Sequence, residues 1–159
     1  MNNPKLILVE AIDKFLLDRM QFINNEYFKF KELPVIKWSK GSVKKKYRKI
    51  TYGTYVIKKK EIRIHPILNN LLIPRYVLEF VIYHELLHFE DYHIREKSNV
   101  RHRGKDRVHT PHFHKREKEF EFKKQASKIM HELARGTYFQ NKEAIVLDKK
   151  KSLELLLFE

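Results

Sequence analysis

Residues 74–93 read PRYVLEFVIYHELLHFEDYH, and this stretch decides the fold. Its apolar residues recur at intervals of three and four, which is the spacing of one face of an α-helix. A proline fits the first turn of a helix, because the first helical residues need no backbone N–H. The pattern predicts a long, mostly buried helix from Pro74 to about His93, whose apolar positions are Val77, Leu78, Val81, Ile82, Leu86 and Phe89.

Inside that helix, His84, Glu85 and His88 form an H-E-x-x-H sequence. Residues four apart share a helix face, so two imidazoles can hold one ion while Glu85 lies within reach of a metal-bound water. Unpaired polar groups in such an apolar stretch would each cost about 1–3 kcal/mol. This cost favours a metal site over core histidines with ordinary hydrogen bonds.

A catalytic zinc ion usually has three protein ligands and one open position, so a third ligand is required. The extended metzincin motif is excluded, because Asp91 and Ile94 stand where it needs a glycine and a histidine. The candidates for the third ligand are His93, His102, His109, His112 and Glu117.

Position along the chain reduces this set. His93 follows His88 by five residues and points elsewhere on the same helix, whereas His102 lies in a charged loop. His109 and His112 flank the start of the next predicted helix, a junction rigid enough to hold a ligand. From the residues alone, both remain candidates.

The sequence before the motif predicts a helix over residues 4–24, with Asn3 as its N-cap. Short runs rich in β-branched and aromatic residues then predict a small antiparallel sheet. Its strands are expected within 34–38, 50–57 and 61–65.

After the motif, residues 94–108 are highly charged and predict an exposed loop. Thr110 is a candidate N-cap for a helix that continues to a glycine stop over residues 111–136. The fold class expected from these elements is α+β. We expect a single domain over residues 1–148 and a short C-terminal tail over 149–159.

The 159-residue chain has no cysteine, which excludes disulfide scaffolds, cysteine-ligated zinc, iron–sulfur clusters and a thiol nucleophile. No apolar run approaches the roughly 20 residues that cross a bilayer. We therefore expect a soluble, intracellular protein, located in the cytoplasm or associated with the nucleoid or nucleus.

The net charge of +14 makes a polyanion the expected partner. Residues 37–60 contain ten Lys or Arg and no acid, interleaved with aromatic residues, a composition suited to single-stranded or distorted DNA. The competing interpretation is that these lysines are solvated strand ends and the aromatic residues belong to the core. The candidate nucleic-acid contacts are Lys44, Lys45, Lys46, Arg48, Lys58, Lys59, Arg101 and Arg103.

Three segments of the chain together resemble the SprT-like metallopeptidases. They are IRIHP at 62–66, YVLEFVIYHELLH at 76–88 and HTPHFHKREKEF at 109–120, and the likeness extends over about residues 33–135. The third zinc ligand of that family is a histidine followed four residues later by an aromatic residue. His109 with Phe113 matches this pattern, whereas His112 is followed by Arg116.

The resemblance implies a zincin-like fold with an N-terminal helix, a small sheet, the metal-binding helix and a helix after the third ligand. It implies one zinc ion held by His84, His88 and His109, with Glu85 as the general base. It also implies a peptidase that acts on proteins associated with or crosslinked to DNA. Many family members carry a cysteine-rich zinc ribbon, which this chain lacks, and the 20 residues between His88 and His109 form an expanded spacer.

Two other functions are compatible with the sequence. The first is a non-catalytic, basic nucleic-acid-binding domain with a structural metal site, although such a site is usually closed by a fourth protein ligand and needs no base. The second is a metal-dependent hydrolase of another amide substrate.

Overall fold

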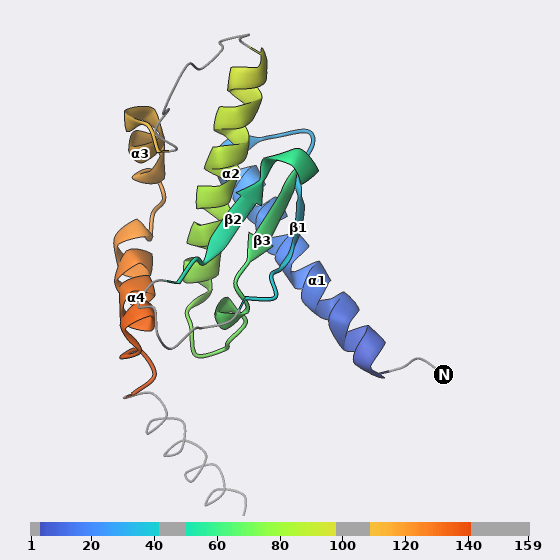
Figure 1. Cartoon of the computed structure of the whole chain (residues 1–159), viewed down its shortest axis with the longest axis vertical. Helices are drawn as coiled ribbons and strands as arrows, with labels where there is room; N and C mark the ends of the chain where they lie inside the picture. The colour runs from blue at the N-terminus through green and yellow to red at the C-terminus, as the bar shows by residue number, and fades with distance from the viewer. Residues whose placement is uncertain (1–3, 42–49, 98–108, 141–159) are drawn as a thin grey trace, which may run out of the picture.

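The computed structural model describes the backbone of residues 4–41, 50–97 and 109–140, and the side chains of 14–41, 50–93 and 109–140. These residues form four α-helices and a three-stranded sheet, so the fold is α+β (Figure 1). Among the described helices, none is both long and apolar enough to span a membrane.

Helix α1 (Pro4–Ile23) begins at the predicted proline and continues as a π-helical turn, Asn24–Phe28. Leu16, Met20 and Ile23 are fully buried, as their spacing predicts. The predicted N-cap, Asn3, lies outside the described residues. Helix α1 packs against the central helix and contributes one side of the core.

The sheet consists of β1 (Val35–Trp38), β2 (Gly53–Val56) and β3 (Glu61–Ile64), in the order β1-β3-β2. The strands lie where the sequence predicts them, but the predicted antiparallel sheet is wrong in part. Strand β1 pairs with β3 in parallel, and only β2 and β3 are antiparallel. The β2–β3 hairpin reverses the chain, so β3 runs in the same direction as β1 and lies between β1 and β2. Strand patterning specifies which residues form strands and leaves their order open.

The motif helix, α2 (Arg75–Lys97), is the centre of the molecule. It packs against α1 and strands β2 and β3, and also against the two C-terminal helices, which lie along another side (Figure 1). Val77, Ile82, Tyr83 and Leu86 are fully buried. The helix extends to Lys97, so residues 94–97 of the predicted loop are helical, and residues 98–108 lie outside the described residues. Arg, Glu and Lys favour helices, and a charged composition alone therefore does not indicate a loop.

The helix predicted over 111–136 is in fact two helices, α3 (Pro111–Glu117) and α4 (Lys123–Arg135). At 100° per residue, Phe113 and Ala126 would point about 140° apart on one continuous helix. Both side chains are buried, at 1% and 0% exposure, so the chain must break between them. The predicted caps are confirmed: Thr110 Oγ1 accepts the N–H of Phe113 at 3.1 Å, and Gly136 ends α4 with φ of +74°.

Candidate metal centre

Three imidazoles converge beside the middle of α2. His84 and His88 lie one turn apart on this helix, and their Nε2 atoms are 3.2 Å apart. His109 immediately precedes the N-cap of α3, and its Nε2 lies 3.2 Å from Nε2 of His88. The ligand atoms of all three residues lie within 4.8 Å of one another, close enough to bind one metal ion.

The spacing of these nitrogens fits a tetrahedral ion. With metal–nitrogen bonds of about 2.0–2.1 Å, two nitrogens on a tetrahedron are about 3.3–3.4 Å apart. The two Nε2 separations of 3.2 Å are close to that value. Burial, followed by the nearby His84, lowers the pKa of His109, which favours the neutral imidazole that a metal needs.

The ring of Phe113 packs against all three imidazole rings of this cluster. Its ring is 1% exposed, and its centroid lies 5.0, 4.6 and 4.8 Å from those of His84, His88 and His109. Because α3 starts directly after His109, the residue one turn into that helix faces α2. The aromatic residue four positions after His109 therefore packs against the three imidazole rings in this chain.

Glu117 lies behind the cluster and orients His84. Its Oε1 is 2.9 Å from Nδ1 of His84, and its Oε2 accepts a hydrogen bond from Nζ of Lys123 at 2.6 Å. Burial raises the pKa of Glu117, but the hydrogen bonds from His84 and Lys123 outweigh it and lower the pKa to about 2. An ionised carboxylate only accepts, so Nδ1 of His84 carries a proton, and Nε2 is the ring nitrogen that lies beside His88.

The other candidates for the third ligand lie elsewhere. His93 stacks on Phe89, with ring centroids 5.9 Å apart, and lies outside the three-histidine group. His112 is exposed on α3 and is also outside the group. Glu117 contacts a histidine of the group instead of joining it. His102 lies outside the described residues.

Glu85 is buried beside the histidines, with 4% exposure. Burial raises its pKa to about 7, although the charge of His84 and the backbone N–H of Tyr55 act in the opposite direction. The carboxyl group lies against strand β2 at Gly53, where an added Cβ would be only 2.7 Å from Oε1 of Glu85. The sequence gives no sign of this role for Gly53, because Gly53 and Glu85 are far apart along the chain.

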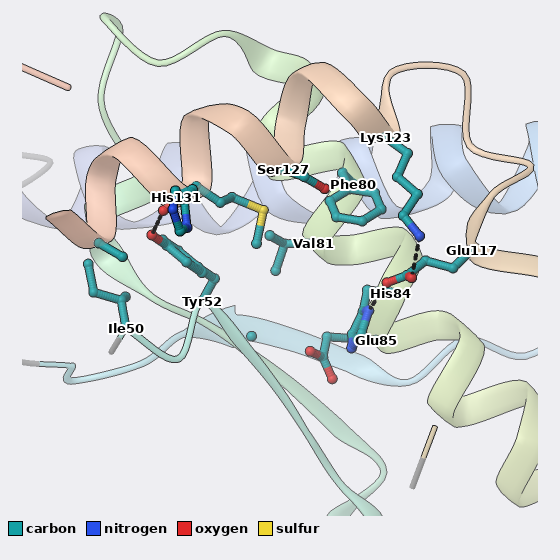
Figure 2. A pocket seen from close by; sticks show the side chains of 13 residues that line it. Ile50, Tyr52, Phe80, Val81, His84, Glu85, Glu117, Lys123, Ser127 and His131 are labelled. Carbon is teal, nitrogen blue, oxygen red and sulfur yellow. Dashed lines mark hydrogen bonds and ion pairs between the residues drawn. The ribbon is translucent and has the colours of Figure 1, made fainter. Parts of the chain in front are cut away.

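Two cavities meet at this carboxyl group. One, of about 400 Å³, is lined by all three histidines and Glu85, together with Tyr55 and Ile57 of the β2 segment; we call it the histidine cavity. The other, of about 490 Å³, lies between α2 and α4 and is drawn in Figure 2; we call it the α2–α4 cavity. Gly53, His84 and Glu85 line both cavities.

Of the candidate nucleic-acid contacts, the structure describes Lys58 and Lys59. Both are exposed in the 3₁₀ turn η2 (Ile57–Lys59), whose first residue lines the histidine cavity. The others, Lys44, Lys45, Lys46, Arg48, Arg101 and Arg103, lie outside the described residues.

No protein-family model, curated protein or solved structure matches the chain.

Proposed function

We propose that this protein is a zinc-dependent metallopeptidase. The observation that carries the proposal is the position of Glu85, a buried carboxyl group with a pKa raised to about 7, beside three converging imidazoles. A general base works best when its pKa is near the working pH. A purely structural metal site has no use for such a group.

Zinc is the metal that this set of ligands suits best. Three imidazole nitrogens suit zinc, two of their separations match a tetrahedral ion, and catalytic zinc sites keep three protein ligands with one open position. Among the described residues, the group contains three ligands and no fourth. The histidine cavity of about 400 Å³ beside them leaves room for water and a substrate carbonyl.

Bound zinc supplies a Lewis acid that polarises the substrate carbonyl and lowers the pKa of water to about 7. Glu85 takes a proton from the attacking water and passes it to the leaving amine, and its partly desolvated position keeps the proton affinity high enough for both steps. The carboxylate of Glu117 holds His84 in one tautomer, 2.9 Å from its Nδ1. Phe113 excludes water from beneath the three rings.

Proteins bound or crosslinked to DNA are the substrates that we propose. The resemblance to SprT-like peptidases, the net charge of +14 and the exposed Lys58 and Lys59 next to the histidine cavity support this choice. Binding to DNA should weaken steeply with added salt, because phosphate contacts release counterions. Binding that is absent or independent of salt would contradict the proposal that the protein acts on DNA-bound substrates.

The test of the peptidase itself is hydrolysis of a protein substrate by the zinc-loaded enzyme and its Glu85→Gln variant. We expect Glu85→Gln to retain zinc and lose hydrolysis, because the amide cannot accept the proton. Glu132→Gln is the matched control, since Glu132 follows His131 on α4 as Glu85 follows His84, but lies outside the three-histidine group. Equal activity in wild type and Glu85→Gln would contradict the mechanism.

A further inference from the structure

The α2–α4 cavity lies next to the reacting centre without being part of the metal site. It shares His84, Glu85 and Gly53 with the histidine cavity but has neither His88 nor His109 in its lining. A group bound there lies past Glu85, on the side away from His88 and His109. In Figure 2 Glu85 lies across this space from Ser127 and His131 of α4.

The walls of the α2–α4 cavity are mainly apolar. Phe80 and Val81 come from α2, Met130 and Ala134 from α4, and Ile50 from the segment before β2. Met130 adds a flexible thioether, which adapts to occupants of different shape. The volume of about 490 Å³ is large enough for a bulky side chain.

Three polar residues of the lining already have partners within the protein. Lys123 and Glu117 form an ion pair at 2.6 Å, so neither offers a free charge to an occupant. The hydroxyl group of Tyr52 donates to the backbone carbonyl of Met130 and ties the start of the hairpin to α4 (Figure 2). An acidic side chain would therefore lose its hydration beside the carboxyl groups of Glu85 and Glu117 without gaining a free counter-ion, which is costly.

The chemistry assigns one substrate residue to this cavity. The substrate carbonyl must face the three histidines, whereas the leaving amine must face Glu85, which gives it a proton. The residue that supplies the amine thus lies on the Glu85 side, where the α2–α4 cavity opens. Resting on the proposed peptidase function, we propose that this cavity binds a large, uncharged apolar side chain of the residue immediately after the cleaved bond.

The first test measures binding, without any need for catalysis. The chain has three methionines, and labelled methyl groups give a separate NMR signal for Met130, which lines the cavity, and for Met20, which is fully buried in the core. The probes are tripeptide amides with phenylalanine, leucine, glycine or aspartate followed by two alanines. They mimic the amine product and are added to the zinc-loaded protein.

We expect the phenylalanine and leucine peptides to shift the Met130 signal at concentrations about 10-fold or more below those needed for glycine or aspartate. The Met20 signal should stay in place. Equal shifts with all four peptides, or no shift of Met130, would overturn the proposal. Because no bond is cleaved, this result does not depend on activity, whereas absent hydrolysis would overturn the peptidase function itself.

The second test fills the cavity. Ser127 is an exposed residue of α4 that lines it, and the next residue, Lys128, is exposed and does not line it. We expect Ser127→Trp to weaken binding of the phenylalanine peptide by about 10-fold and to reduce kcat/KM for substrates with phenylalanine after the cleaved bond by a similar factor. Lys128→Trp should change neither value. Identical binding in both variants would overturn the proposal.

Discussion

Gly53→Ala tests how closely strand β2 positions Glu85, the proposed general base. An added Cβ would lie 2.7 Å from both Oε1 of Glu85 and Cγ1 of Val81, which is about 0.7 Å inside the 3.4 Å at which ordinary contact begins. Gly53 is held by its pairing with Ile64, and Val81 is 3% exposed within the core. The Glu85 side chain must therefore move, and the Val81 side chain must adjust with it.

The expected loss follows from that displacement. A misplacement of about 1 Å can cost about 100-fold in rate. A shift of about 0.7 Å should then lower kcat by about 10- to 100-fold, which corresponds to about 1.4–2.7 kcal/mol in the activation barrier. KM and zinc content should change little, because the three atoms nearest to the new methyl group belong to Glu85 and Val81 and not to a histidine.

The assay is steady-state hydrolysis of one peptide substrate, with zinc measured in each sample. Thr51→Ala is the matched control, because Thr51 lies two residues before Gly53, is exposed and lines neither cavity. We expect Thr51→Ala to behave as wild type. A kcat for Gly53→Ala within twofold of wild type would refute the reasoning, as would loss of zinc from this variant.

Three further outcomes follow from the same geometry. Glu117→Gln removes the charge that holds His84, so zinc affinity should fall by about 10- to 100-fold in a chelator competition, and an unchanged affinity would contradict this role. Phe113→Ala removes the ring that packs against the three imidazole rings and should lower the free energy of unfolding by about 3–5 kcal/mol in urea, whereas a loss below about 1 kcal/mol would be inconsistent with the packing. The pKa of Glu117 is lowered from its ordinary value of 4.5 to about 2, so its ionised carboxylate stabilises the fold at pH values above 4.5. This stabilisation is lost as the pH falls from 4.5 toward 2. The melting temperature of the metal-free protein should fall over this range in wild type and fall less in Glu117→Gln; equal curves would exclude the contribution.

Local patterns predicted the part of the site that lies on one helix. His84, Glu85 and His88 are close in sequence, and helix geometry alone places the two imidazoles on one face. The buried positions of α2 followed from the same periodicity. His109 is different, because two histidines at the α3 junction were equally suitable on spacing, and only the resemblance favoured His109.

The remaining features depend on contacts between distant segments. Glu117 approaches His84 from α3, and Gly53 meets Glu85 from the edge strand, so neither role is visible in a linear pattern. The break between α3 and α4 also follows from tertiary packing, because it lets Phe113 and Ala126 both reach the core. The parallel pairing of β1 with β3 has the same origin, since pairing partners are chosen in three dimensions.

The most direct measurement is the zinc content of the purified chain, made without a metal-affinity tag, by elemental analysis. We expect about one zinc per chain in wild type and in His112→Ala, and loss of that zinc in His88→Ala and His109→Ala. Both histidines have Nε2 atoms in the converging group, whereas His112 is an exposed residue outside it. Wild-type protein without zinc after reconstitution, or zinc retained in His109→Ala, would contradict the three-histidine centre.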